Sequence, residues 1–254
     1  MILLDDKQVE ALESRRLADE QVHVDPPPTY ASLQQATSSS QSLSAPGGNP
    51  TNYFSMTRVH ESIRETVIID PALFIPAYLL PPLAHDETPN SRRHLRLEST
   101  HGSISANVKI VPNFGGERCK VRMLMRSTHG GITARIQGKE PRHPFQLVAH
   151  SANGNIALRL PRSFQGPIVI SLRHGSVKFS DGIDQHLTTF GEANHVRHCF
   201  VGDFSRWADS RKDWSGDELI IEARHGGVRI SYEDDAPGSV VRSRPSLLNR
   251  VFGF

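Results

Sequence analysis

The sequence predicts an all-β fold, either a repeat-built β-solenoid or a stacked two-sheet domain with five His/Asn-Gly turn units, preceded by a disordered N-terminal arm. The main evidence is a repeat: in five segments an alternating strand leads into a His-Gly or Asn-Gly pair and then into a second alternating strand. The composition agrees, because 37% hydrophobic residues, 22% charged residues and a mean hydropathy of -0.39 suit a globular core with additional polar length.

The turn pairs follow one another at similar steps, except for the last step, which is about twice as long and must contain an insertion or a degenerate unit. Counted from the His or Asn as zero, apolar residues recur at positions −6, −4, +3 and +5 of every unit, as expected of strands with one buried face. The turn pairs are His101-Gly102, His129-Gly130, Asn153-Gly154, His174-Gly175 and His225-Gly226. The predicted core residues are Leu95, Leu97, Ile104, Ala106, Met123, Met125, Ile132, Ala134, Leu147, Ala149, Ile156, Leu158, Ile168, Ile170, Val177, Phe179, Leu219, Ile221, Val228 and Ile230.

The glycine of each pair suits a sharp reversal, because glycine adopts a positive φ without strain and Asn and His tolerate the same region. Such a pair can close a two-residue hairpin or form the corner between two sheets of a solenoid, and the apolar pattern fits both. Repeat units of this length favour stacked coils. The residue two positions before the turn is mostly small (Ser99, Ser127 and Ser151), which suits a backbone that bends sharply onto the core.

Composition divides the chain into three regions. We expect residues 1–57 to form the disordered arm, residues 58–236 the β-repeat domain and residues 237–254 a short C-terminal tail. Residues 26–57 contain no charged residue and few large apolar ones, so burial cannot offset the entropy of ordering them. The proline-rich apolar segment 70–82 is expected to cover one end of the core.

A short motif in the arm predicts a partner. Pro27, Pro28 and Tyr30 form the PPxY pattern that WW domains bind. A polyproline II segment is largely preformed, so it loses little entropy when it docks into an aromatic groove. The motif therefore predicts a WW-domain protein such as a ubiquitin ligase as partner; the alternative is a proline-rich linker that binds nothing.

Charge and cysteine usage exclude several classes of protein. Lys and Arg number 29 against 27 Asp and Glu, and this net charge of +2 does not indicate nucleic acid as the partner. Cys119 and Cys199 lie far apart without C-x-x-C spacing, which fits a reducing compartment rather than a disulfide framework. We expect a cytoplasmic protein with no secretory signal, no membrane span and no cofactor.

Two sets of histidines are candidate metal ligands. The turn histidines form a row, but rungs about 4.8 Å apart hold neighbouring rings farther apart than two ligands of one tetrahedral ion. His195, His198 and Cys199 form a second set, in which His198 and Cys199 point to opposite faces of a strand. We therefore predict no metal site.

The insertion before the fifth unit contains both tryptophans, Trp207 and Trp214, and several acids, including Asp203 and Asp213. Tryptophan beside carboxylates suits a surface that stacks on and hydrogen-bonds to sugars. In the structural alternative, the tryptophans cap an open end of the stack. A glycan is thus a candidate partner, and a carbohydrate-active or carbohydrate-binding β-helix protein is the alternative function.

No motif of an enzyme class is present: the sequence lacks G-x-S-x-G, H-E-x-x-H, a P-loop and a dinucleotide fingerprint. We predict no catalytic residue and a non-catalytic interaction module, whose β surface binds a protein or a glycan. Basic residues at exposed positions of the repeats are candidates for an anion-binding surface. They are Arg96, Lys109, Arg122, Arg135, Arg159, Arg173, Arg224 and Arg229.

At these repeats the sequence closely resembles a fungal family of uncharacterised proteins with a domain of unknown function, numbered 7330. The resemblance covers roughly residues 58–235 and includes the five turn units, VIIDPALFIPAYLLPPL, LPRSFQGPIVISLRHGSVKFS and CFVGDFSRWADSRKDWSGDELIIEARHGGVRISY. More distantly, the Ser-x-Asn/His-Gly-x-Ile pattern is similar to an adhesin repeat domain of bacteria. The resemblance implies a β-solenoid and no particular activity.

Overall fold

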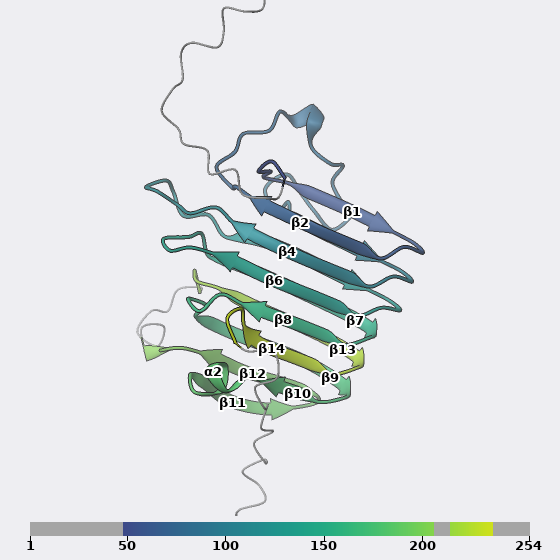
Figure 1. The fold of residues 1–254 in the computed structure, drawn as a ribbon, viewed down its shortest axis with the longest axis vertical. Helices are drawn as coiled ribbons and strands as arrows, with labels where there is room; N and C mark the ends of the chain where they lie inside the picture. The colour runs from purple at the N-terminus through teal and green to yellow at the C-terminus, as the bar shows by residue number, and fades with distance from the viewer. Residues whose placement is uncertain (1–47, 206–213, 236–254) are drawn as a thin grey trace, which may run out of the picture. The chain divides into compact units, whose positions relative to one another are not determined.

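The computed structural model describes residues 48–205 and 214–235, which form two β-sheets packed face to face (Figure 1). One sheet contains β1 (Phe54–Arg58), β3 (Leu95–Ser99), β5 (Val121–Ser127), β7 (Phe145–Asn153), β13 (Glu218–His225), β9 (Gly166–His174), β12 (Val196–Val201) and β11 (Leu187–Ala193), in that spatial order. The other contains β10 (Val177–Phe179), β14 (Val228–Tyr232), β8 (Ile156–Leu160), β6 (Ile132–Gly138), β4 (Ile104–Ile110) and β2 (Ile63–Ile69), again in spatial order. The predicted all-β, two-sheet fold is confirmed.

The turn pairs are corners between the two sheets. In each unit the strand before the pair lies in the eight-stranded sheet and the strand after it lies in the six-stranded sheet. Equivalent strands of stacked units pair in parallel, for example Leu95 with Met123 and Ile104 with Ile132. This parallel pairing excludes the hairpin alternative at the repeats and establishes stacked rungs.

The core lies between the sheets and consists of the residues that the alternation predicted. All of them are buried except Val177, which is partly buried and packs against the others. Because successive rungs bury the same positions, apolar side chains of neighbouring rungs stack on one another along the sheets.

The role expected of the turn glycines was partly wrong. Only Gly175 and Gly226 have positive φ values, and none of the turn histidines does. What all five positions share is close backbone contact, since a Cβ on Gly130 would collide with the carbonyl group of Gly102 on the rung below. The positive-φ pair instead lies at Asn194 and His195, the two-residue turn between β11 and β12.

A sixth rung precedes the five expected ones. It consists of β1 and β2, and His60 and Glu61 occupy its corner. Glycine is not needed there, because this rung begins the stack of described strands and no other described corner lies beneath Glu61. Phe54 and Met56 pack partly against the core, so the first strand lies within the last residues of the segment that we assigned to the arm.

The last rung in sequence is not the last rung in space. β13 pairs in parallel with both β7 and β9, so the final strand pair lies between the third and fourth predicted units (Figure 1). The long step before it contains α2 (Asp181–Asp184) and the antiparallel β11–β12 hairpin, which extends the eight-stranded sheet beyond β9. The insertion is therefore a sheet extension followed by a strand that returns into the stack.

The proline-rich segment after β2, which we expected to cover one end of the core, has exposed aromatic side chains. It contains the short helix η2 (Ala77–Leu79), and Phe74 and Tyr78 are 85% and 84% exposed. Its first residues are held by Asn52, whose amide donates to the carbonyl oxygens of Pro71 and Leu73. Among the described residues, no helix is long and apolar enough to cross a membrane.

Candidate functional site

The predicted site residues lie in very different positions. Pro27, Pro28, Tyr30, Trp207 and Asp213 are outside the residues that the structure describes. Asp203 follows β12: its carboxylate accepts from the Ser205 N–H at 2.9 Å, and its carbonyl accepts from the Gln165 amide at 2.9 Å. Asp203 thus helps to shape the loop that leaves the hairpin.

Trp214 has a structural environment. Its indole N–H donates to the carbonyl oxygen of Asp217 at 2.6 Å, and its ring meets the buried Phe200 edge-on at 5.3 Å. Phe200 alternates with the inward-facing Cys199 and Val201, so it points to the outer side of the eight-stranded sheet. Trp214 therefore covers this outer side, rather than the open end of the stack that the capping alternative predicted.

The turn histidines do form a row along one edge. His60 stacks on His101 at 5.1 Å and His101 on His129 at 4.9 Å, and beyond Asn153 His225 stacks on His174 at 5.0 Å. Parallel rings at this separation do not converge on one point. In the part of the chain that the structure describes, no three His, Cys, Asp or Glu residues are grouped so that they could hold a metal ion.

The two cysteines are also held as ordinary structural thiols. Burial raises the pKa of Cys119 and, more deeply in the core, that of Cys199. Both are therefore thiols at neutral pH, whereas the thiolate is the nucleophilic form.

The basic residues expected on one exposed surface are divided between two opposite faces. Lys109, Arg135, Arg159 and Arg229 belong to the six-stranded sheet, and Arg96, Arg122, Arg173 and Arg224 to the eight-stranded sheet. The two outer faces differ in how their positive charges are compensated.

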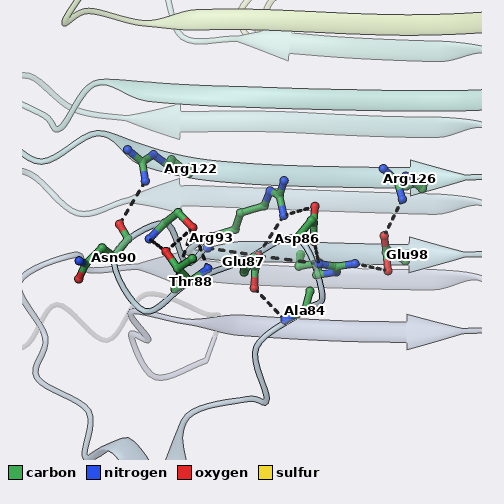
Figure 2. A network of polar contacts seen from close by, with 11 residues as sticks. Ala84, Asp86, Glu87, Thr88, Asn90, Arg93, Glu98, Arg122 and Arg126 are labelled. Atoms are coloured by element: carbon green, nitrogen blue, oxygen red, sulfur yellow. Dashed lines mark hydrogen bonds and ion pairs between the residues drawn. The ribbon is translucent and has the colours of Figure 1, made fainter.

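On the eight-stranded sheet, acids accompany the arginines near β3 and β5. Figure 2 shows Asp86 and Glu87, from the segment before β3, beside Arg93, and Glu98 beside Arg126. Arg96 is paired with Asp86 and Glu98 at 3.1 and 3.0 Å. Burial alone would raise the pKa of Asp86, but hydrogen bonds from Arg96 and Arg93 outweigh it and lower the pKa to about 2.

On the six-stranded sheet, outward positions bring basic residues together. The register places Arg135 beside Arg159 and Arg229 beside Lys178 on adjacent strands, which are about 4.8 Å apart. Arg64 and Lys109 lie on β2 and β4 of the same face. Among the described residues, no outward position of these six strands holds an acid.

Few acids reach this face from elsewhere. Glu233, just after β14, approaches the Arg135 guanidinium at 3.6 Å and accepts a hydrogen bond from Gln137 at 3.1 Å. Within the described chain, Arg64 and Arg159 form no ion pair. We define the basic face by the outward residues Arg64, Lys109, Arg135, Arg159, Lys178 and Arg229. Neighbouring like charges destabilise a sheet, so this face carries an electrostatic cost that an anion would relieve.

A shallow pocket of about 390 Å³ lies within the basic face, across β2, β4, β6 and β8. Small residues Ser105 and Thr133 lie side by side on its floor, and arginines surround them. Its lining consists of Arg64, Glu65, Thr66, Ser105, Ala106, Asn107, Thr133, Ala134, Arg135 and Arg159. The chemistry that these groups offer is binding of an anion with additional hydrogen bonds.

Sequence reasoning named four members of the basic face and missed Arg64, Lys178 and the pocket. Arg64 belongs to the first rung, which lacks the turn glycine, and Lys178 looks like any exposed strand residue. Parallel register could have revealed the pocket, since aligning the five units brings Ser105, Thr133 and Ala157 into one row.

The fold and the face define a class: an all-β repeat domain of two parallel-rich sheets with a basic outer surface. Residues 52–235 match the family described as Domain of unknown function (DUF7330). The match spans most of the chain, which therefore belongs to that family, as its resemblance implied. Comparisons with curated proteins and with solved structures found no match.

Proposed function

We propose that the chain is a non-catalytic interaction module that binds an acidic glycan through the basic face. The observation that carries this proposal is the set of basic side chains on neighbouring strands with hardly any acid between them. The sheet fixes the backbone positions of these side chains, so binding a charged partner costs side-chain freedom but requires no ordering of the backbone.

The kind of anion follows from the other side chains on this face. Single-stranded nucleic acid is commonly held by aromatic rings that stack on its bases, and the outward positions of the described six-stranded sheet contain no aromatic residue. Hydroxyl and amide groups lie among the arginines instead: Thr66, Ser105, Asn107, Thr133 and Gln137. Mixed guanidinium, hydroxyl and amide groups suit a partner that carries both negative charges and hydroxyl groups.

The test is retention of the full chain on immobilised heparin and polygalacturonate, with neutral dextran and poly-glutamate as comparison matrices. The double variant Arg135→Gln/Arg159→Gln should elute from the acidic glycans at clearly lower salt than the wild type. The matched control Arg173→Gln/Arg224→Gln removes the same charge from the other sheet and should elute like the wild type. Equal losses in the two variants, or equal retention on poly-glutamate, would contradict the proposal.

The arm adds a second binding function, which rests on the sequence motif at Pro27, Pro28 and Tyr30. In this proposal a WW-domain protein, such as a ubiquitin ligase, is recruited through the arm while the β domain holds the glycan. Two unpaired cysteines, Cys119 and Cys199, support a reducing location such as the cytoplasm for this assembly.

A peptide of residues 22–35 should bind an isolated WW domain in the micromolar range, as measured by fluorescence anisotropy. Tyr30→Ala should abolish binding, because the tyrosine fills an aromatic groove. Thr29→Ala is the matched control, since the PPxY pattern leaves this position open. Equal affinities of the wild-type and Tyr30→Ala peptides would exclude the WW function and leave the basic face unaffected.

A further inference from the structure

The pocket in the basic face has the features of a specific subsite rather than of a diffuse charged surface. Arg64 on β2 lies next to Ser105 on β4, and Ser105 lies next to Thr133 on β6. Arg135 and Arg159 lie one row further along β6 and β8. Guanidinium groups from three different strands therefore surround two adjacent hydroxyl groups.

Polar groups of the floor lack protein partners. Among the described residues, the hydroxyls of Ser105 and Thr133 form no hydrogen bond with another side chain or with the backbone. The side-chain oxygen of Asn107 is buried and also has no partner. That oxygen is not accessible from the pocket, so the exposed Ser105 and Thr133 hydroxyls are the groups of the floor that a ligand can reach.

Glu65, the acidic residue in the pocket lining, does not direct its carboxylate toward a bound anion. Glu65 lies between Arg64 and Thr66 on β2, and side chains alternate along a strand, so its carboxylate is directed to the other side of the strand. Glu233 meets Arg135 from beyond β14 and is not part of the lining. The pocket itself is therefore positively charged.

We infer that this pocket binds one anionic sugar unit, a polyhydroxylated ring with a carboxylate or phosphate group. The acidic group would lie among Arg64, Arg135 and Arg159, while ring hydroxyls exchange hydrogen bonds with Ser105 and Thr133. A volume of about 390 Å³ lies in the range of small-molecule sites. The inference rests on the proposed function and assigns a specific subsite for the acidic glycan.

The test is titration of the full chain with glucuronate and glucose 6-phosphate, followed by calorimetry and by amide chemical shifts. Glucose and inorganic phosphate are the probes that lack one of the two recognition features, and each should bind at least about tenfold more weakly. Chemical-shift changes should centre on β4, β6 and β8. Equal binding of inorganic phosphate and glucose 6-phosphate would overturn the sugar assignment.

Variants separate the subsite from the basic face as a whole. Ser105→Ala/Thr133→Val removes both hydroxyls without changing charge, and we expect about tenfold weaker binding of the anionic sugars. Ser231→Ala/Ser176→Ala, outside the pocket lining, is the matched control and should leave their affinity unchanged. The charge of the basic face is unchanged in these variants, so retention on heparin should fall far less than the affinity for the anionic sugars. If the wild type is retained on heparin but binds neither anionic sugar, the subsite is excluded and the proposed function stands. If the wild type is not retained on heparin, the proposed function itself is excluded.

Discussion

At the residue scale, the corners show why glycine and serine recur in the repeats. Glycine removes the Cβ that would strike the carbonyl of the rung below. Serine two positions before the turn then satisfies such a carbonyl: Ser127 Oγ donates to Gly102 O at 3.1 Å, and Ser151 Oγ donates to Gly130 O at 3.2 Å. Close approach and buried hydrogen bonds are therefore two consequences of one tight corner.

Gly130→Ala should lower the free energy of unfolding by about 2 kcal/mol or more, because the added methyl group must displace backbone atoms of Gly102 and Ser103. Urea denaturation measures the change. Gly191→Ala is the control, since no atom lies within 4 Å of its added Cβ, and the expected change is below about 0.5 kcal/mol. Similar losses in the two variants would mean that close packing is not what requires glycine at the corners.

A second residue-scale feature is the half-buried His94. Its Nδ1 accepts a hydrogen bond from the backbone N–H of Arg122 at 3.1 Å. Its ring stacks on that of Tyr53, with the ring centroids 5.4 Å apart. Burial, followed by the positive charges of Arg122 and His143, lowers the pKa of His94 from 6.5 to about 4. The folded protein thus holds this imidazole neutral at a pH where the unfolded chain protonates it.

Between about pH 6.5 and pH 4 the unfolded state binds the extra proton, so stability should fall as the pH falls through this window. The contribution of His94 reaches up to about 3 kcal/mol. His94→Asn keeps an acceptor for Arg122 but does not titrate. Urea denaturation at pH 7 and pH 4.5 should therefore show a smaller loss in His94→Asn than in the wild type. Identical pH dependence would assign the loss to other groups.

At the element scale, one carboxylate fixes the position of β13. Asp217, just before β13, accepts hydrogen bonds from the N–H groups of Phe145 at the start of β7 and Gln165 just before β9, at 3.1 and 3.3 Å. Its oxygens also bind the Arg142 guanidinium at 2.7 and 2.6 Å, and both side chains are almost fully buried. Asp217 thus connects both neighbours of the inserted strand.

Asp217→Asn should lower the free energy of unfolding by about 3 kcal/mol, because it removes the buried countercharge of Arg142 and leaves only the exposed Glu140 beside it. Asp234→Asn is the matched control: its ion pair with Arg162 at 3.0 Å is exposed and screened by solvent, so the expected loss is far smaller. Chemical denaturation compares the two variants. An equally small loss in both would show that the Arg142 pair does not hold β13 in place.

The strands and their buried faces could be predicted from the sequence, because alternation and turn pairs are local signals. The position of β13 could not, since Leu219 and Ile221 present the same inward pattern as every other rung and would fit between any two of them. The first rung was missed because Glu61 replaces the glycine. The basic face combines residues that are distant in sequence, and only the order of strands shows that Arg64, Arg135 and Arg159 are neighbours.

At the scale of the whole molecule, charge is divided unevenly despite a net charge of only +2. Acids of the segment before β3 compensate arginines of the eight-stranded sheet, while the basic face keeps most of its charge. A surface of this kind lowers stability through repulsion among its own side chains.

Arg135→Gln/Arg159→Gln should consequently stabilise the domain by a few tenths of a kcal/mol at low ionic strength. The gain should vanish near 1 M salt, where charges are screened over roughly 3 Å. Thermal unfolding at low and high salt measures both effects. A loss of stability at low salt would indicate that these two arginines support the fold instead of repelling each other.

The placement of β13 and β14 also determines what a shortened chain would lose. In an ordinary solenoid, removing the last repeat trims one end and leaves the remaining coils in contact. Here residues 218–232 form an interior layer. The strands β7, β8 and β9 can therefore pair with β13 and β14 only after almost the whole domain has been synthesised. A premature stop ahead of residue 218 would remove a layer from the middle of the stack.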